Sequence, residues 1–437
     1  YKAKDGAFVR EHFFGTRPEL QEMVKDLSDE EIWKLNRGGH DPYKVYAAYH
    51  DAVNHEGQPS VILAKTIKGY GTGAGQGQNT AHNTKKVDID SLKKFRDRFD
   101  IPVNDDQLEK LPFYKPEEGS AEYKYLHARR EALGGYMPQR RVESQRVPVP
   151  PLDTLKAILD GTGDREISTT MAFVRILSQL VKDKELGSRI VPIVPDEART
   201  FGMEGMFRQL GIYTAEGQKY VPEDRDQIMY YREDKKGQIL EEGINEDGSM
   251  AAWMAAATSY STNNFPLIPF YIFYSMFGFQ RVGDLAWASG DIQARGFLIG
   301  GTAGRTTLNG EGLQHQDGHS HVLANTIPNC KAYDPAYGYE MAVVLRKGMK
   351  EMFEDNQNVF YYLTIENENY EQPAMPKDCE DGIIKGMYKF ESVETKGNKK
   401  TPRVQLLGAG AILNEVRAAA QMLKDDWGVA SDVWSVT

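Results

Sequence analysis

The chain has 437 residues, 40% hydrophobic and 27% charged, which is typical of a soluble globular protein with about two to four domains. Its net charge of −10 argues against a general nucleic-acid binder, because phosphate contacts require clustered Lys and Arg. No apolar run is long enough to cross a membrane, and Cys330 and Cys379 have neither metal-site spacing nor the density of a disulfide framework. We therefore expect a cytoplasmic protein that binds neither nucleic acid nor membranes. The start at Tyr1, without Met or a signal peptide, indicates a cut end.

Local signals near the start predict two helices and a strand. Residues 28–31 form a capping box for a short helix, which the glycine pair 38–39 ends. Residues 41–42, Asp-Pro, begin a second helix that runs to about residue 53. The apolar run 60–67 predicts a buried strand.

A glycine-rich segment follows this strand. Five glycines lie between Gly69 and Gly77, and His82 and the lysine pair 85–86 come next. Such a segment costs much backbone entropy to order. We interpret it as a mobile loop at the carboxyl end of a strand, with a functional role rather than that of a spacer.

An α/β pattern begins after a proline-rich linker. Residues 88–134 are mostly helical and charged, and residues 135–152 lack periodicity and form the linker. Ser168 caps a predicted helix, and 189–194 is a predicted buried strand. This strand ends on two acids, Asp196 and Glu197.

The central stretch places polar residues at strand ends. Glu246 precedes a run of small residues, and Asp247 or Ser249 is expected to cap the helix there. Residues 265–279 predict a fully buried aromatic strand with its exit turn, and 297–304 predict another strand. The second strand leads to a loop with three histidines, His315, His319 and His321. In open parallel sheets ligands bind at such strand ends.

The last part continues the α/β pattern. Residues 334–335, Asp-Pro, predict a helix start. That helix has an apolar face and a charged face, and the charged face comprises Arg346, Lys347, Lys350 and Glu351. Residues 359–365 predict a strand, and the segment from residue 404 to the end predicts a β-α-β unit.

Three motifs have competing interpretations. Gly408 and Gly410 follow a strand as in a dinucleotide fingerprint, but the third glycine position is Leu413, which argues against a nucleotide site. His315 and His319 suggest zinc by spacing, but glycines interrupt the segment and no Cys accompanies it, so a site for an anionic substrate is favoured. Glu246 is either a carboxylate favoured by the helix dipole or a buried acid suited to proton exchange.

Long segments of the chain resemble the thiamine diphosphate enzymes of the transketolase type. The resemblance is stronger to the homodimeric first component of bacterial pyruvate dehydrogenase complexes, and it extends over essentially the whole chain. The segments that carry it are DEARTFGMEGMFRQLGIY, EEGINEDGSMAAWMAAATSYSTNN, PFYIFYSMFGFQRVGDLAWASGDIQARGFLIGGTAGRTTLNGEGLQHQDGHSH and IPNCKAYDPAYGYE. The resemblance implies an α/β thiamine diphosphate-binding fold with parallel sheets flanked by helices.

The resemblance also implies roles for individual residues. Glu246 matches the glutamate that hydrogen-bonds the aminopyrimidine ring of the cofactor, and Phe277 matches the aromatic residue that stacks on that ring. Tyr274, His315 and Lys68 are expected to face the substrate carboxylate or its adduct. The resemblance further implies that Asp196 and Glu197 belong to an acidic network at the dimer interface. The role of His82 follows from the glycine-rich loop instead: closure of this loop is expected to bring His82 to the acyl-transfer step.

One departure from the family concerns the diphosphate and Mg²⁺ motif, a GDG followed by an asparagine, which this sequence lacks. The resemblance places it upstream of Tyr1, so residues 1–437 alone are expected to bind thiamine diphosphate weakly. The expected domains are the C-terminal part of the diphosphate-binding domain (1–134), the linker (135–152), the pyrimidine-binding domain (153–375) and the start of a transketolase C-terminal-like domain (383–437).

The activity implied by the resemblance is thiamine diphosphate-dependent oxidative decarboxylation of pyruvate. The acetyl unit would pass to the lipoyl group of dihydrolipoamide acetyltransferase, and the enzyme would be a homodimer with Mg²⁺. Three alternatives stay open: a 2-oxoglutarate decarboxylating component, a ketol transferase, or an inactive assembly scaffold.

Overall fold

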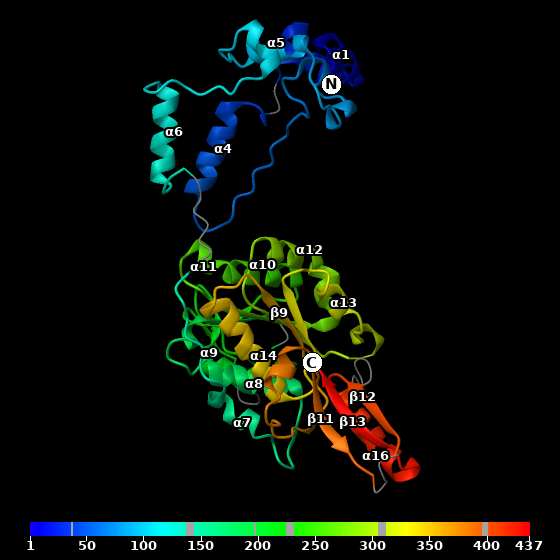
Figure 1. Cartoon of the computed structure of the whole chain (residues 1–437). Helices are drawn as coiled ribbons and strands as arrows, with labels where there is room; N and C mark the ends of the chain where they lie inside the picture. Colours follow the sequence, from blue (N-terminus) through cyan, green and yellow to red (C-terminus); the bar gives the residue numbers. More distant parts are fainter. Residues whose placement is uncertain (36–37, 137–143, 196–197, 224–230, 305–311, 396–400) are drawn as a thin grey trace. The chain divides into compact units, whose positions relative to one another are not determined.

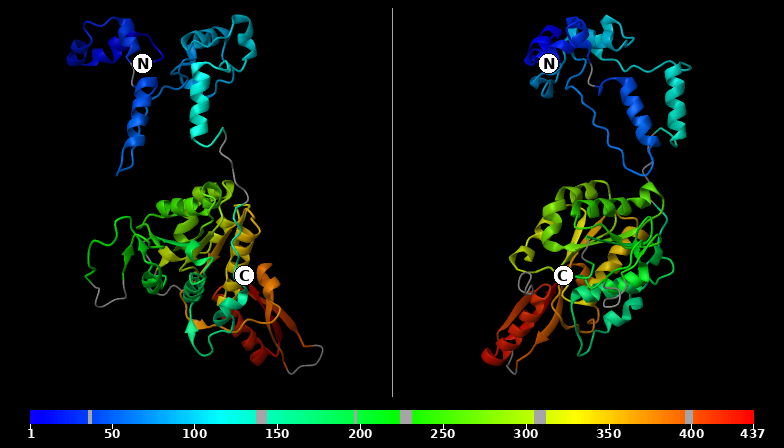
Figure 2. Two further views of the ribbon diagram at one scale, coloured as in Figure 1. Left: turned by 90° about the vertical axis from the view of Figure 1, so that its left-hand side faces the viewer. Right: turned by 180° about the vertical axis from the view of Figure 1, so that it is seen from behind.

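A computed structural model covers the chain and describes all residues except 36–37, 137–143, 196–197, 224–230, 305–311 and 396–400. The chain divides into two compact units, residues 1–138 and 139–437. Ribbons of both units are drawn in Figures 1 and 2.

The described part of the first unit is helical. Its helices are α1 (Gly6–His12), α2 (Pro18–Met23), α3 (Asp29–Lys34), α4 (Pro42–Asn54), α5 (Ile89–Arg98) and α6 (Ala121–Ala132), with 3₁₀ turns η1 (Phe14–Thr16), η2 (Gly73–Gly75), η3 (Asn79–His82) and η4 (Asp105–Lys110). The Ser28 capping box begins α3, and Asp41 caps α4 with Pro42 at its first position. Both predicted helix starts are confirmed.

The strand predicted at 60–67 is wrong. These residues form no strand, and the side chains of Val61 and Leu63 are 82% and 91% exposed. A strand is stable only when its backbone N–H and C=O groups pair with a neighbour. The described residues of the first unit include no strand that could pair with this segment.

The second unit is built on a six-stranded, all-parallel sheet in the order β5-β2-β6-β7-β9-β8. The strands are β2 (Ile190–Val194), β5 (Leu240–Glu241), β6 (Ile268–Tyr274), β7 (Phe297–Gly301), β8 (Cys330–Tyr333) and β9 (Phe360–Thr364). The predicted strands at 189–194, 265–279, 297–304 and 359–365 are thereby confirmed. So is the expectation of a parallel sheet flanked by helices.

Successive side chains along a strand point to opposite faces of this sheet, and both faces are apolar. In β6, Phe270 and Ile272 pack into one apolar cluster, whereas Tyr271 and Phe273 pack into another. Figure 1 shows α10, α12 and α13 over one face and α8, α9 and α14 over the other. The helices are α7 (Lys156–Leu159), α8 (Thr169–Leu180), α9 (Glu204–Leu210), α10 (Glu246–Ala257), α11 (Ser259–Thr262), α12 (Gly278–Asp291), α13 (Ser320–Ala324), α14 (Gly338–Met349), α15 (Glu380–Ile384) and α16 (Ile412–Trp427).

Shorter elements complete the unit. They are the 3₁₀ turns η5 (Leu152–Leu155), η6 (Gly187–Arg189), η7 (Ser275–Phe277) and η8 (Leu313–His315), the π-helical turn η9 (Lys350–Glu354), and the strands β1 (Glu166–Ile167), β3 (Ile212–Tyr213), β4 (Glu233–Asp234) and β10 (Tyr370–Glu371). None of the helices that the structure describes is both long and apolar enough to span a lipid bilayer.

Two helix starts differ from their predictions. Asn245, rather than Asp247 or Ser249, caps α10, and its side chain accepts a hydrogen bond from the backbone N–H of Gly248. Helix α14 begins at Gly338 instead of at residues 334–335. Asp334 does not cap it, because its half-buried carboxyl accepts a 2.6 Å hydrogen bond from Thr364 instead.

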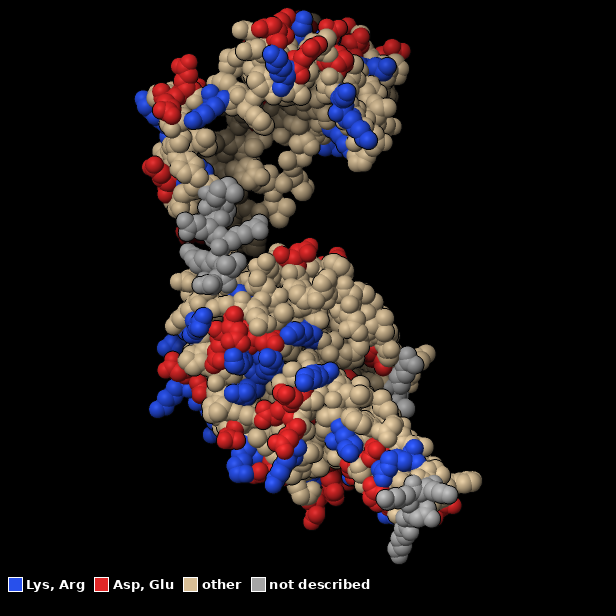
Figure 3. All heavy atoms as spheres, in the orientation of Figure 1, with Lys and Arg blue, Asp and Glu red and all other residues tan. Residues whose placement is uncertain are grey.

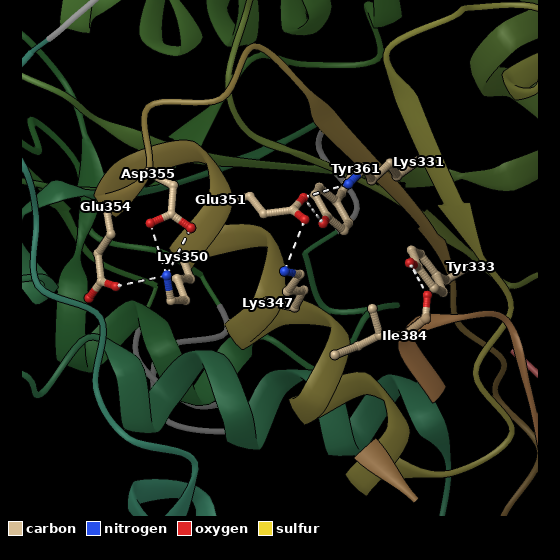
Figure 4. A network of polar contacts seen from close by, with 9 residues as sticks. All are labelled: Lys331, Tyr333, Lys347, Lys350, Glu351, Glu354, Asp355, Tyr361 and Ile384. Atoms are coloured by element: carbon tan, nitrogen blue, oxygen red, sulfur yellow. Dashed lines mark hydrogen bonds and ion pairs between the residues drawn. The ribbon is translucent and has the colours of Figure 1, made fainter. Parts of the chain in front are cut away.

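The predicted charged face of α14 is also partly wrong. The side chain of Glu351 is 5% exposed, and it accepts hydrogen bonds from Lys331 on β8 and Tyr361 on β9 and pairs with Lys347 (Figure 4). Burial acts to raise the pKa of Glu351, but the hydrogen bonds from these three residues outweigh it and hold the pKa below its ordinary value. Glu351 therefore lies in the interior as the acceptor of a polar network.

A second, three-stranded sheet has the order β11-β13-β12, with β11 (Met387–Val393), β12 (Arg403–Gly408) and β13 (Ala430–Val436). The predicted β-α-β unit is confirmed as β12, α16 and β13, whose two strands are parallel. Strand β11 was not predicted, and it pairs antiparallel with β13 through a register shift between Lys389 and Glu391. Its alternation of polar and apolar residues is weak.

Candidate functional site at the carboxyl ends of β6 and β7

Three aromatic rings meet where β6 and β7 end. Strand β6 ends at Tyr274, and the turn η7 places Phe277 directly after it. The ring of His315 lies 4.8 Å from that of Tyr274 and 5.4 Å from that of Phe277, in both cases edge-on. Neighbouring parallel strands end at the same edge of a sheet, with Tyr274 opposite Gly301. The structure thus brings together three of the predicted site residues. They span 41 positions of the sequence, from Tyr274 to His315.

Glu246 lies beside this aromatic group, at the first position of α10. Its side chain is 14% exposed and forms an ion pair with Arg281 of α12. The guanidinium of Arg281 in turn lies 4.5 Å from the centre of the Phe277 ring. Arg281 therefore joins the predicted acid to the predicted aromatic residue.

Arg281 was not predicted as part of the site. Its separation of four residues from Phe277, at the beginning of a helix, is a signal that both face the same side. The contact with Glu246 comes from packing of α10 against α12, which local spacing does not reveal.

Asp317 organises the histidine-rich loop. This buried carboxylate accepts hydrogen bonds from the backbone N–H groups of His319 and Ser320, each at 3.0 Å, and from the Ser320 hydroxyl at 2.5 Å. Burial opposes its ionisation, but these hydrogen bonds hold the pKa of Asp317 below its usual value. Gln280 Nε2 donates to His319 Nε2 at 2.6 Å, which ties the loop to α12.

The three histidines of this loop do not converge. His315 contacts the aromatic group, His319 contacts Gln280, and His321 Nε2 is hydrogen-bonded to the Thr364 hydroxyl at 2.9 Å. Within the described ranges, no group of three or more His, Cys, Asp or Glu side chains is arranged to hold a metal ion.

Lys68 and His82 meet in the first unit. Lys68 Nζ donates to His82 Nδ1 at 2.5 Å, and both side chains are exposed. The intervening glycine-rich segment forms a series of turns, closed by the Gly77 N–H to Lys68 C=O bond of 2.9 Å and by the Gln76 side chain, which accepts from Gly71 N–H. Loop mobility stays a prediction.

Asp196 and Glu197 lie outside the described residues. They follow Val194, the last residue of β2, and β2 pairs with β6.

The turn at Gly408 and Gly410 is filled by side chains of the chain itself. The Ala411 N–H donates to Glu366 Oε2 at 3.2 Å, and a Cβ atom at Gly410 would overlap Glu366 Oε1. The Glu366 side chain therefore occupies the space next to this turn.

Comparison with known proteins identifies the class and then the family. Residues 386–437 match the transketolase-like C-terminal domain. Solved transketolases share the fold: the Campylobacter jejuni enzyme has a TM-score of 0.61 over 91% of this chain and 55% of its own, and the Leishmania mexicana enzyme 0.57 over 91% and 53%, both at 17% identity. The fold is therefore of the transketolase type.

Residues 147–373, more than half of the chain, match the pyruvate dehydrogenase E1 component middle domain. The pyruvate dehydrogenase E1 component of Pseudomonas aeruginosa is 74% identical over 100% of this chain, that of Cupriavidus necator 62% over 99%, and that of Escherichia coli K12 58% over 100%. The chain belongs to the pyruvate dehydrogenase E1 component family. It spans about half the length of these relatives, 48 to 49%.

Proposed function

We propose that the protein containing this chain catalyses the thiamine diphosphate-dependent oxidative decarboxylation of pyruvate. The acetyl unit would be passed to the lipoyl group of dihydrolipoamide acetyltransferase. The observation that carries the proposal is the group formed by Glu246, Tyr274, Phe277 and His315 at the carboxyl ends of parallel strands, in a chain of this family.

The residues of this group fit the pyrimidine half of thiamine diphosphate. Glu246 offers a carboxylate acceptor at a helix start, and Phe277 offers an aromatic face beside it. When bound, the cofactor supplies the nucleophilic carbon and the electron sink that protein side chains lack. Glu246 would exchange a proton with the ring nitrogen, and the diphosphate and Mg²⁺ would be held by residues outside this group.

His315 and Tyr274 would orient the substrate. Both carry groups that donate hydrogen bonds, and pyruvate offers a carboxylate and a ketone oxygen as acceptors. The ring of His315 packs edge-on against both Tyr274 and Phe277. Such preorganised donors stabilise negative charge as it develops.

His82 would serve the acyl-transfer step, together with Lys68. The Lys68 ammonium donates to His82 Nδ1, which leaves Nε2 as the ring nitrogen on the opposite side. With Nδ1 as the acceptor, Nε2 carries the ring hydrogen. We propose that Nε2 donates this proton to the lipoyl sulfur that is released when the disulfide bond breaks, and that the Lys68 ammonium passes a proton to Nδ1.

A second copy of the chain is the proposed partner of the second unit. Trp287 of α12 and Ile292, the residue that follows α12, are each 47% exposed, and Val322 of α13 is 67% exposed. Figure 3 shows few Lys, Arg, Asp or Glu side chains over this region in the view drawn. An apolar, weakly charged surface is typical of a homodimer interface. Asp196 and Glu197 would belong to its acidic network.

The test is carbon dioxide release from pyruvate with an artificial electron acceptor, using a full-length protein that contains this chain. Pyruvate turnover supports the proposal. Preference for 2-oxoglutarate, or turnover only with a ketose phosphate donor, would assign the other transketolase-type activities. No turnover with any substrate would indicate an assembly scaffold.

A further inference from the structure

Asp317 connects the histidine-rich loop to the sheet on one side and to α13 on the other. The Asp317 N–H donates to the Gly304 carbonyl at 3.1 Å, just beyond the end of β7. The Asp317 side chain is 3% exposed, and its carboxylate accepts from the backbone N–H groups of His319 and Ser320, where α13 begins. His315 lies two positions before Asp317, so the chain is fixed directly after the predicted site histidine.

A buried series of hydrogen bonds continues from Asp317 to the middle of the sheet. Asp317 Oδ2 accepts from Ser320 Oγ at 2.5 Å, and Ser320 Oγ accepts from the hydroxyl of Tyr362 on β9 at 2.9 Å. Gly300 of β7 leaves space for that hydroxyl, since a Cβ atom there would lie 2.4 Å from it. Buried polar networks whose members are satisfied are rigid, so this series holds Asp317 in one place relative to the strands.

The ring of His319 connects Asp317 to the first turn of α12. Gln280 Nε2 donates to His319 Nε2 at 2.6 Å, and His319 Nδ1 lies 3.6 Å from Asp317 Oδ1. A neutral ring that accepts at Nε2 carries its hydrogen at Nδ1, on the side of the carboxylate. The contacts of Asp317 thus extend to the turn that follows Phe277, one of the two rings against which His315 packs.

We propose that Asp317 is a positioning residue that holds His315 where it can orient pyruvate. This inference rests on the proposed function. Only Gln316 separates the two residues, so the position of Asp317 is passed to His315 through the backbone. Groups that orient a substrate must keep their places to within about 0.5 Å. A carboxylate is suited to this role because both of its oxygens accept hydrogen bonds, whereas a side-chain amide has one acceptor oxygen.

Substitutions of graded severity define the expected effect on pyruvate turnover by full-length protein. Asp317→Asn keeps the shape and one acceptor oxygen but loses the acceptor for the Ser320 hydroxyl, and kcat/KM should fall by about 10-fold. Asp317→Ala removes all of the side-chain bonds and should lower kcat/KM by about 10², the effect of a displacement of about 1 Å. Ser320→Ala is the mildest change, and it tests the proposal if the Asp317 variants do not fold.

A double-mutant cycle with His315→Ala separates positioning from a general loss of stability. If Asp317 acts through His315, Asp317→Asn should cause no further loss of kcat/KM in that background. Turnover is measured with enzyme in excess, so that slow variants are resolved. Calorimetric titration with thiamine diphosphate and Mg²⁺ should give an affinity within about twofold of wild type, because Glu246 belongs to α10 rather than to this loop.

Glu351→Gln is the matched control. It changes another buried carboxylate that accepts hydrogen bonds, from Lys331 and Tyr361, and it lies on an element that does not carry the predicted site residues. This variant should lower the Tm but leave kcat/KM within about twofold of wild type.

A loss of kcat/KM that disappears in the His315→Ala background supports the proposal. Wild-type kcat/KM in the Asp317 and Ser320 variants overturns it, and so does an equal loss with and without His315. Weaker thiamine diphosphate binding that accounts for the whole loss also overturns it. If wild-type full-length protein does not turn over pyruvate, the proposed function fails, and the inference fails with it. Wild-type turnover without an effect of Asp317 rejects the inference alone.

Discussion

The carboxyl groups of Asp334 and Glu366 both lie against one glycine, Gly410. A Cβ atom there would overlap Glu366 Oε1 and lie 3.3 Å from both Asp334 oxygens. Glu366 is buried and Asp334 is half-buried, and each accepts a hydrogen bond, Asp334 from Thr364 and Glu366 from the Ala411 N–H. Burial and the neighbouring Asp334 raise the pKa of Glu366 to about 8. Glu366 is therefore protonated at neutral pH, next to the turn that begins α16.

Glu366→Gln should stabilise the protein at alkaline pH. Because the folded-state pKa of Glu366 is raised, the folded chain holds a proton that the unfolded chain releases, and the free energy of unfolding falls as pH rises from about 4.5 to about 8. Gln keeps the shape of the protonated acid and does not ionise. We expect a gain on the order of 3 kcal/mol at pH 8 and little change at pH 4.5, measured by thermal unfolding.

The control for this prediction is Glu371→Gln, which changes an exposed carboxylate on β10. It should leave the pH profile of unfolding unaltered. If the free energy of unfolding depends on pH in the same way for Glu366→Gln and for wild type between pH 5 and 8, then Glu366 is ionised over that whole range.

Gly410→Ala should be more destabilising than Gly428→Ala. Both glycines have positive φ, 51° and 62°, which costs an alanine about 1 kcal/mol. Gly428 has open space around a Cβ atom, whereas at Gly410 the Cβ would overlap a carboxyl oxygen. We expect an additional loss of about 2 kcal/mol or more at position 410, measured by denaturant unfolding. Equal losses would contradict the close packing at Gly410.

Glu246→Gln should lower pyruvate turnover by a factor of about 10² or more, because the amide keeps the shape but loses proton exchange. Pyruvate-dependent release of carbon dioxide by the full-length variant is the measurement. Asp247→Asn is the matched control, since Asp247 lies in the same first turn of α10 and is exposed. Wild-type turnover in the Glu246 variant would refute the proposed role.

His82→Ala should separate the two half-reactions. Decarboxylation measured with an artificial acceptor should persist, while reductive acetylation of the lipoyl domain should fall by about 10² to 10⁴, the contribution of one positioned acid or base. His50→Ala is the control, because His50 is an exposed histidine of α4 in the same unit. Wild-type rates in both half-reactions would mean that the glycine-rich segment is a spacer.

Local signals in the sequence were sufficient for much of the fold. The capping box at Ser28 and the cap at Ser168 were predicted from residues within one helical turn, and both are present. The buried strands β6 and β9 followed from uninterrupted apolar runs. Such signals succeed because the hydrogen bonds and side-chain alternation that produce them involve neighbours along the chain. The site roles of Glu246, Tyr274, Phe277 and His315 came instead from the resemblance of longer segments to a known family.

Where the sequence pattern was ambiguous, contacts between distant segments determined the local structure and the partners of charged side chains. Residues 60–67 have the composition of a strand, but strand formation needs a paired neighbour. Asp334 precedes a proline like a helix cap, yet its carboxyl accepts a hydrogen bond from Thr364. Glu351 has the helical phase of a surface residue but contacts Lys331 and Tyr361 in the interior. The pairing of Arg281 with Glu246 likewise depends on how α10 and α12 pack. The partner of a charged side chain is set by contacts between distant segments, which local spacing does not encode.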